Sequence, residues 1–359
     1  DQNGDLLFYT DGITVWNKLH DVLQGGVGLM GDPSSTQSGI IVPRPQSTTL
    51  YYIFSVAAQA NPNGLTYSEV DMTLDGGLGG ITGVYNEPLL TPTCEKVTAV
   101  LHSNGTDIWV ISHKWNSNEF YTYLVTDAGL DTTPVISAIG TSISGVSDNT
   151  IGYLKASPSG TKIALAHWTY DEVQVFDFNS TTGELSNEMT IGENYGGYGP
   201  YGLEFSAGSQ YLYVATHLLS NPNSSTIISE LHQYDLLSAD PPSSGQIVGE
   251  SASSIWFGAL QLAINGKIYI NDVGTDHLSV IHNPEQAGAG CNFEYNAQDL
   301  VTGTQGVYGL PPFIQSYFID ANFQYTGICL GDTTEFQASV DTYDALQWNF
   351  GDPDSGPLN

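Results

Sequence analysis

The chain has 359 residues, and its 38 acidic side chains against only 7 basic ones give a formal net charge of −31. This charge argues against nucleic acid and anionic lipid as partners, because few cations are available to neutralise phosphates. The sequence contains no apolar run as long as a membrane-spanning helix needs, so we expect no direct insertion into a membrane.

A short phrase recurs along the chain: a polar turn that contains glycine, followed by a hydrophobic strand. A degenerate copy spans Arg44 to Phe54, and the others read, for example, HSNGTDIWV and SPSGTKIAL. The glycines of the five clear copies are Gly4, Gly105, Gly160, Gly208 and Gly266. Copies at a period of about 50 residues indicate a repeat architecture.

Each repeat contains further strand-like stretches. An apolar stretch precedes the turn, as in KVTAVL and YGLEFS, and another follows the strand, as in FYTYLVTD and VQVFDF. A weaker fourth stretch closes several units. Four antiparallel strands per repeat are typical of a β-propeller blade. The sequence therefore predicts an all-β fold, with a propeller of six or seven four-stranded blades over residues 1–318.

The two ends of this predicted propeller suggest how the ring closes. The first unit begins at its turn and lacks the strand before it, whereas GVYGLPPFIQSYF near residue 318 resembles a strand that opens a blade. Either this late segment closes a six-bladed ring, or residues before Asp1 complete a seventh blade. Both solutions would pair the first and last strands and remove an exposed edge.

The pattern changes over residues 319–359. Alternating strands lead into WNFGD at Trp348 to Asp352, which resembles the first half of a PKD, immunoglobulin-like module. A sandwich of this type needs more residues than this segment holds. We therefore expect a truncated PKD-like domain over 319–359.

Several longer stretches carry a wider resemblance. GDLLFYTDGITVWNKLHDV, EKVTAVLHSNGTDIWVISHKWNSNEFYTYLVT and GLPPFIQSYF are similar to the propeller-plus-PKD surface proteins of Bacteroidetes-type bacteria, the gliding-motility-associated or type IX secretion substrates. The resemblance implies secretion, with an extracellular or outer cell-surface location. It also implies further domains of the same polypeptide before Asp1 and after Asn359. It implies no particular reaction.

A polar residue follows the second strand in five units, on the face opposite the glycine turns. These residues are Asp11, His113, His167, His217 and Asp272. A ring of His and Asp at the channel mouth could bind zinc, manganese or iron. The alternative is that they are separate loop residues, too far apart for one ion. We also expect calcium to be possible at sites that the sequence does not specify, and no other cofactor.

Aromatic residues are predicted on the same face. They are Trp115, Trp168, Tyr170, Tyr198, Tyr201, Trp256 and Phe257. Aromatic faces beside polar side chains suit stacking on sugar rings, so the first six are candidate ligand-binding residues. The alternative is that these rings fill the gaps between blades.

The sequence shows no recognisable catalytic set. Ser34, Ser35 and Ser38 form no nucleophile elbow. Glu95 and Lys96 begin a strand, and we expect them to form a buried salt link with neighbouring charged groups. The odd number of cysteines suggests a partner outside the chain, and the disulfide partners of all three stay open; they are Cys94, Cys291 and Cys329.

These observations predict a secreted cell-surface binding or adhesion protein without enzymatic activity. Its propeller would present a platform for a glycan or a surface protein on a PKD stalk. One alternative is a metal-dependent propeller hydrolase or lyase that uses the His and Asp ring. Another is a structural subunit of an extracellular filament.

Overall fold

The computed structural model describes residues 5–193, 195, 198–218, 228–252, 254–318, 323–326 and 335–338. The chain forms two compact units, Asp1–Ile319 and Asp320–Asn359. In the second unit, β26 (Phe323–Thr326) pairs antiparallel with β27 (Glu335–Ala338). The WNFGD stretch lies outside the described residues, so the PKD-like domain stays a prediction. Over the residues described, no helix is long and apolar enough to cross a membrane.

The first unit consists of five sheets over the residues described, and in the second to the fifth every strand is antiparallel to its neighbours. The second sheet contains β9 (Thr93–Leu101), β10 (Ile108–Lys114), β11 (Ser117–Thr126), β12 (Gly129–Leu130) and β13 (Val135–Ile143). The third contains β14 (Leu154–Ala156), β15 (Lys162–His167), β16 (Glu172–Asn179) and β17 (Glu184–Glu193). The fourth contains β18 (Tyr198–Phe205), β19 (Tyr211–Leu218), β20 (Glu230–Asp235) and β21 (Gln246–Glu250). The fifth contains β22 (Phe257–Leu262), β23 (Ile268–Asp272), β24 (His277–Ile281) and β25 (Phe293–Asp299).

The first sheet is larger than the others. Its strands are β4 (Gly39–Pro43), β5 (Leu50–Val56), β6 (Leu65–Asp71), β7 (Gly80–Ile81) and β8 (Glu87–Leu90), extended by β1 (Phe8–Thr10), β2 (Thr14–Asn17) and β3 (Val22–Val27). Short 3-10 turns connect some strands of the unit: Asp75–Gly77, Ser147–Thr150, Trp168–Tyr170, Pro242–Ser244, Gly288–Cys291 and Gln315–Phe318.

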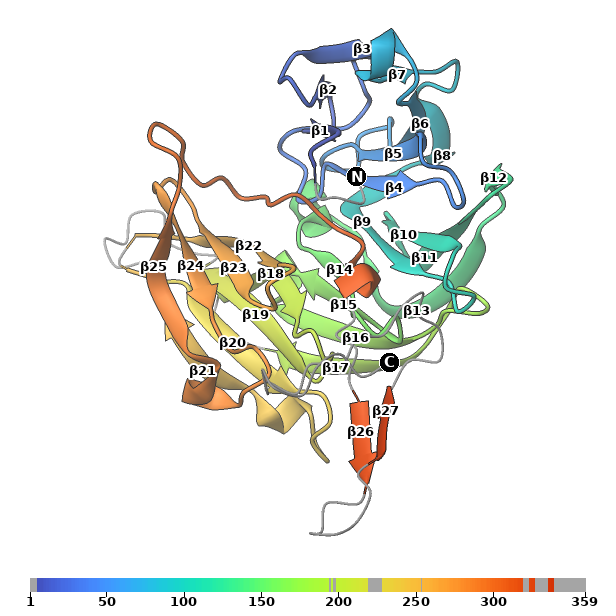
Figure 1. Ribbon diagram of the computed structural model, residues 1–359. Coiled ribbons are helices and arrows are strands. Elements are labelled where there is room, and N and C mark those ends of the chain that lie inside the picture. The colour runs from blue at the N-terminus through green and yellow to red at the C-terminus, as the bar shows by residue number, and fades with distance from the viewer. Residues whose placement is uncertain are drawn as a thin grey trace. The chain divides into compact units, whose positions relative to one another are not determined.

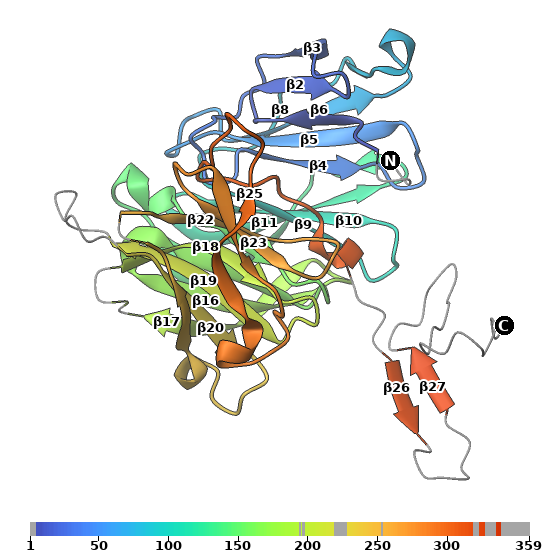
Figure 2. The same ribbon diagram turned by 60° about the vertical axis from the view of Figure 1, so that its left-hand side comes forward.

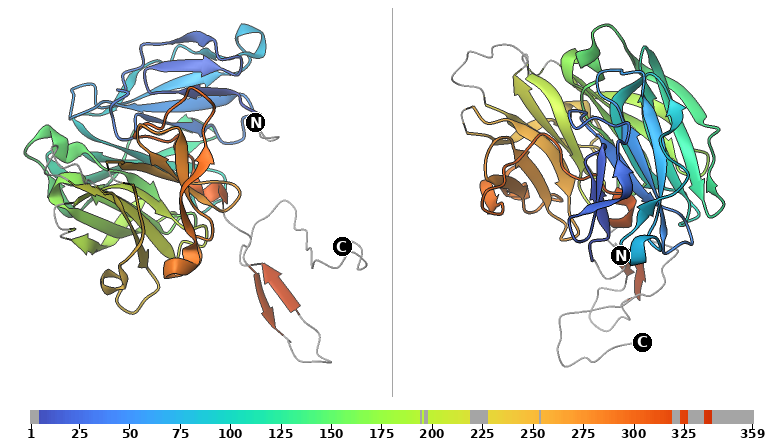
Figure 3. Two further views of the ribbon diagram at one scale, coloured as in Figure 1. Left: turned by 90° about the vertical axis from the view of Figure 1, so that its left-hand side faces the viewer. Right: turned by 90° about the horizontal axis from the view of Figure 1, so that it is seen from above.

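The sheets follow one another around a common axis in chain order (Figure 1). The colours pass from blue through green and yellow to orange around the unit in both panels of Figure 3. The first strands of neighbouring sheets, such as β9 and β14 or β18 and β22, pack against each other. This arrangement is a β-propeller, and the strands nearest the axis are β4, β9, β14, β18 and β22.

The described residues form five such sheets with a strand at the axis, and the predicted count of six or seven blades stays a prediction. The strands that bear on this count lie at the N-terminal end. There, β1, β2 and β3 join the outer edge of the first sheet through a parallel contact between Gln24 and Gly80. The side chains of Phe8, Val15 and Leu23 in these strands pack against Ile53 and Val70 of the first sheet in one buried cluster, as successive sheets do elsewhere in the unit.

The hydrophobic core lies between successive sheets rather than in one central mass. Ile111 of the second sheet and Phe176 of the third belong to one buried cluster, and Tyr213 of the fourth and Leu260 of the fifth belong to another. Because the middle strands are covered on both faces, they are apolar along most of their length. Figure 2 shows these layers from the side.

The recurring glycine turns connect the first and second strands of a sheet. Gly105, Gly160 and Gly266 have φ of 75°, 68° and 73°, a left-handed conformation that glycine adopts without a steric penalty. In the fourth copy the left-handed residue is Ser209, one position after Gly208. The repeated glycine therefore allows the tight turn of the hairpin between the first and second strands.

Residues 300–318, the return segment, lead from β25 back to the axis (Figure 1). The predicted blade-opening strand is wrong here, because the segment contains only the 3-10 turn Gln315–Phe318. Pro311 and Pro312 have no N–H group and cannot supply strand hydrogen bonds. The segment is held instead by single contacts, including Ala259 N–H to the Tyr308 carbonyl at 2.8 Å.

Candidate active site

A pocket of about 190 Å³ opens where the first strands of the sheets begin. Its wall combines four aromatic rings with an aliphatic side chain, two hydroxyls and one carboxylate. The lining residues are Ser34, Thr36, Glu95, Ile151, Trp168, Tyr201, Trp256 and Tyr308. They come from strands β9 and β18, from the segments that precede β4, β14 and β22, from the 3-10 turn after β15, and from the return segment. Tyr308 is 42% exposed and Glu95 only 2%, so Glu95 lies at the closed end.

The Glu95 carboxylate is held in place by backbone and hydroxyl donors. Its Oε2 accepts hydrogen bonds from the Thr36 N–H at 2.9 Å and the Thr36 hydroxyl at 3.1 Å, and Oε1 accepts one from the Gln59 N–H at 2.8 Å. The Thr150 hydroxyl lies 3.4 Å from Oε1, but its single proton goes to the Ser147 carbonyl at 2.6 Å. Oε1 therefore retains capacity for a further donor.

The aromatic rings of the pocket meet at steep angles. The centroids of Trp256 and Tyr308 are 5.9 Å apart at 61°, and those of Tyr201 and Tyr308 are 6.0 Å apart at 68°. Tyr153 packs behind Tyr201 at 5.5 Å and 78°. These rings therefore stand at steep angles to one another and form no single flat surface.

Three of the aromatic residues singled out from the sequence lie in this pocket: Trp168, Tyr201 and Trp256. Trp115 is 8% exposed and packs in the core between the second and third sheets, as the alternative reading expected. Tyr170 packs against the same core, and its hydroxyl donates to the Ser144 carbonyl at 2.9 Å.

Phe257 and Tyr198 are the other two aromatic residues singled out from the sequence. Phe257 is fully buried between the fourth and fifth sheets. Tyr198 begins β18, and its side chain lies outside the described residues. The sequence reasoning missed Thr36 and Tyr308, and it assigned no ligand role to Glu95.

The predicted salt link of Lys96 is wrong. Its Nζ donates to the carbonyls of Ile151, Gly152 and Ala166 at 2.9, 2.6 and 3.1 Å. Burial lowers the pKa of Lys96 to about 8. Lys96 therefore joins the second sheet to the third and leaves Glu95, its neighbour in the chain, without a cationic partner in the part of the chain described.

His113 and His167 are fully buried at the ends of β10 and β15. Burial lowers the pKa of His113 well below its usual value and that of His167 to about 3, so both rings are neutral at pH 7. His113 Nδ1 lies 3.7 Å from the Cys94 sulfur, and His167 Nε2 lies 3.0 Å from the Gln174 side-chain oxygen. Cys94 and Cys291 are buried free thiols, and Cys329 lies outside the described residues.

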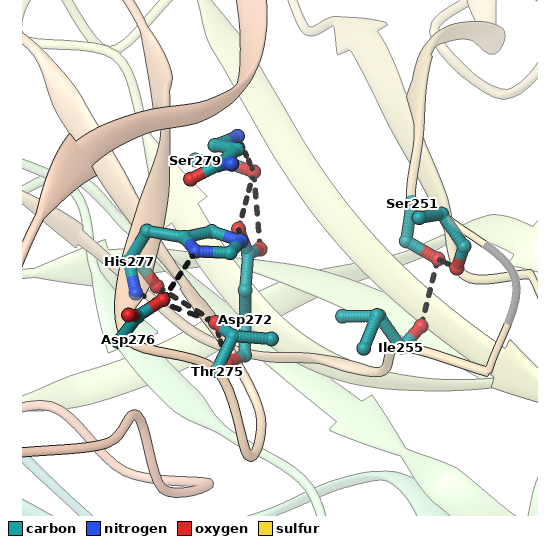
Figure 4. Close-up of polar contacts among 9 residues, drawn as sticks. Ser251, Ile255, Asp272, Thr275, Asp276, His277 and Ser279 are labelled. Carbon is teal, nitrogen blue, oxygen red and sulfur yellow. Dashed lines mark hydrogen bonds and ion pairs between the residues drawn. The ribbon is translucent and has the colours of Figure 1, made fainter.

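The two aspartates of the predicted ring have local partners. Asp11 accepts hydrogen bonds from the N–H groups of Ile13 and Thr14 at 2.9 and 2.7 Å. The buried Asp272 carboxylate faces the Ser279 hydroxyl, at 3.0 and 2.8 Å from its two oxygens, and lies beside the His277 ring, whose Nε2 is 3.8 Å away (Figure 4). Burial raises the pKa of Asp272 to about 6.

The His and Asp residues do not form a metal centre in the part of the chain that the structure describes. No group of three or more His, Cys, Asp or Glu side chains there could hold an ion. The side chain of His217 lies outside the described residues.

A second polar cluster lies on the strands at the axis. Lys155 Nζ donates to Glu204 at 3.0 Å and to Gln261 at 3.1 Å, and Gln315 of the return segment donates to Glu204 at 2.6 Å. Glu204 also accepts from the Leu262 N–H at 2.9 Å. Burial raises the pKa of Glu204, and the nearby Lys155 opposes that rise. This cluster joins the third, fourth and fifth sheets.

Comparison with protein-family models found no match, and comparison with curated proteins found none either. Solved structures with the same kind of fold were found. Hydrazine synthase of Kuenenia stuttgartiensis is 10% identical over 91% of this chain and 90% of that one, with a TM-score of 0.49. The periplasmic gluconolactonase PpgL of Pseudomonas aeruginosa is 12% identical over 93% and 98%, with a TM-score of 0.40. The β-propeller domain of Cps50 (Swd1) from Myceliophteria thermophila is 11% identical over 73% and 86%, with a TM-score of 0.40.

These comparisons correct one sequence-based expectation. The chain was predicted to be an adhesion protein without enzymatic activity, whereas the similar structures include enzymes by name, among them a gluconolactonase and a luciferin-regenerating enzyme. That prediction is wrong by this comparison, and we do not retain it. At such low identity the likeness itself concerns the fold, so the argument for a reaction comes from the pocket.

Proposed function

We propose that the chain is a hydrolase that acts on small esters or lactones in the pocket at the propeller axis, with Glu95 as general base. The observation that carries the proposal is the Glu95 carboxylate at the closed end of the pocket, oriented by three hydrogen bonds and able to accept another. A general base needs this combination of fixed position and spare acceptor capacity. Pockets with apolar walls and a few converging polar groups are the usual form of small-molecule sites.

The residues of the pocket can support each step of ester hydrolysis. Glu95 would take a proton from water while the water oxygen bonds to the carbonyl carbon, and charge would build on the carbonyl oxygen. Burial raises the pKa of Tyr201 well above its usual value, so its hydroxyl, which is hydrogen-bonded to the Thr36 side chain, stays protonated and would turn to donate to that oxygen when the ester binds. The C–O bond to the leaving alkoxide would then break, and Glu95 would return the proton to the alkoxide.

The test compares the parent with Glu95→Gln, using p-nitrophenyl acetate and δ-valerolactone as probes. We expect kcat to fall by about 100-fold or more, the usual contribution of a general base, with little change in KM. Glu87→Gln is the matched control, because Glu87 is an exposed glutamate in β8, outside the pocket. It should retain the parent rate.

Two results would contradict the proposal. One is a panel of small esters and lactones that the parent does not hydrolyse, and the other is equal rates for the parent and Glu95→Gln. Reaction in ¹⁸O-labelled water separates hydrolysis from elimination, since only hydrolysis places the label in the carboxylate product.

Secretion and a cell-surface location stay part of the proposal, as does the presence of further domains. Their support is the resemblance of residues 1–318 to secreted propeller proteins and the acidic composition. Fractionation of cells that express the full-length polypeptide tests them, and retention in the cytoplasm would contradict them.

A further inference from the structure

The walls of the pocket carry a charge pattern that the hydrolase proposal does not use. Among the described residues that line the pocket, Glu95 alone carries a formal charge, and none is Lys, Arg or His. The two buried lysines near the axis do not offset it, because Lys96 donates to three backbone carbonyls and Lys155 pairs with Glu204. The pocket is thus a negatively charged site in a chain with a formal charge of −31.

The geometry of the rings adds a second, independent observation. Tyr308 meets both Trp256 and Tyr201 at angles above 60°, with centroids about 6 Å apart. The four rings line one small volume together with Glu95, and their T-shaped contacts give them different orientations, whereas a sugar ring is recognised by stacking on a single flat face. Several aromatic faces around one small volume are the usual receptor for quaternary ammonium groups.

We infer that the pocket binds a quaternary ammonium group, so that the substrate class is esters that carry such a cation. The ester part of this substrate rests on the proposed hydrolase function, and the cationic part rests on the pocket alone. Glu95 would supply the counter-charge, while Trp256, Tyr201 and Tyr308 would supply the aromatic walls. A trimethylammonium group fits the volume of about 190 Å³ and leaves space for a short ester arm.

Calorimetric titration of the whole chain with two probes of equal shape tests the inference. Choline carries the charge, and 3,3-dimethyl-1-butanol replaces its nitrogen with carbon. In 150 mM NaCl, choline should bind at least about tenfold more tightly, as expected for desolvated cation–π contacts together with a counter-charge. Equal binding of the two probes, or no binding of choline at millimolar concentration, would overturn the inference.

Variants separate the pocket from general attraction to an acidic surface. Trp256→Leu and Tyr308→Leu keep the net charge and should each weaken choline binding by about 5- to 30-fold. Trp16→Leu is the matched control, because Trp16 lies in β2, outside the pocket, and it should leave the affinity unchanged. Tyr308 is partly exposed, so its replacement is expected to leave the fold intact. Unchanged choline binding by both pocket variants would overturn the inference.

The two proposals fail separately in these experiments. Choline binding without hydrolysis of any ester would contradict the hydrolase proposal and leave the cation site standing. Hydrolysis of p-nitrophenyl acetate without choline binding would do the reverse. Binding of methyl β-glucoside in place of choline would identify a sugar site and overturn the cation inference.

Discussion

Two glutamates, Glu95 of β9 and Glu204 of β18, are almost completely buried at the axis of the same propeller, yet their surroundings differ. Glu204 contacts the ammonium group of Lys155, the Gln315 amide and backbone N–H groups. Glu95 receives only neutral donors and faces a pocket. A carboxylate whose acceptor sites are filled by the protein holds sheets together, whereas one with an open site can serve a ligand.

The largest expected effect is the loss of stability when Glu204 loses its cation. Lys155→Met should lower the free energy of unfolding by about 3–5 kcal/mol, because it leaves a buried charge without its counter-ion. The comparison predicts a smaller loss of about 1–2 kcal/mol for Glu95→Gln, which keeps neutral partners. Urea denaturation measures both, and equal losses would break the distinction between the two sites.

The pH dependence of the Lys155→Met loss sharpens this test. Burial already raises the pKa of Glu204, and removal of Lys155 removes a group that opposes the rise. A carboxyl whose pKa is raised on folding stabilises the fold below its unfolded pKa and loses that contribution as the pH rises through its folded pKa. The loss should therefore be smaller at pH 4 than at pH 8. In the control, Lys155→Met with Glu204→Gln, most of the stability should return.

Asp272 is a third buried carboxylate, and its environment lies between those of Glu204 and Glu95. Its neighbours are the Ser279 hydroxyl and the His277 ring, and its pKa is raised from 3.8 to about 6 by burial. Its protonated form stabilises the fold below pH 3.8, and this contribution is lost as the pH rises through 6. Asp272→Asn should thus match the parent near pH 4 and exceed its unfolding free energy by about 1–3 kcal/mol at pH 8. Thermal melts over this range would contradict the assignment if the difference did not change with pH.

The smallest effect concerns the glycine turns at the other end of the strands. Gly266 has a φ of 73°, and an added β-carbon would meet no atom within 4 Å, so Gly266→Ala should cost about 1 kcal/mol through backbone strain alone. Gly83→Ala is the control, since Gly83 has equally open space and no positive φ. Neither change should alter hydrolysis or choline binding. An effect on either activity would mean that the turns and the pocket are coupled.

The sequence predicted the scaffold better than the site. The turn glycines and the apolar strands follow local rules of hairpins and covered sheets, so the blade strands could be predicted from the repeat. Trp168, Tyr201 and Trp256 were found by the same register, because they lie where strands begin or end. Trp115 looks the same in the sequence, but the third sheet covers it. Only the packing of neighbouring blades decides whether such an aromatic residue lines the pocket or lies in the core.

Other features depend on contacts that no local pattern records. Glu95 joins the pocket through Thr36 and Gln59 of the first sheet, more than thirty residues earlier in the chain. Its signal was a glutamate next to a lysine within a predicted buried strand, where a buried charge requires a reason. The blade count and the path of the return segment depend on which edge each segment joins, and the paired prolines were the clue against a strand.

The return segment also has a consequence for the order of folding. Gln315 donates to Glu204 and Ser316 accepts the Leu101 N–H at 2.9 Å, so one short stretch joins the fourth sheet and the second, 111 and 215 residues away in sequence. During synthesis the sheets emerge one after another, but the return segment becomes available only after all five sheets have been synthesised. Until then Glu204 lacks one of its donors, and the nascent chain would sample a looser arrangement of blades that tightens cooperatively in a late step.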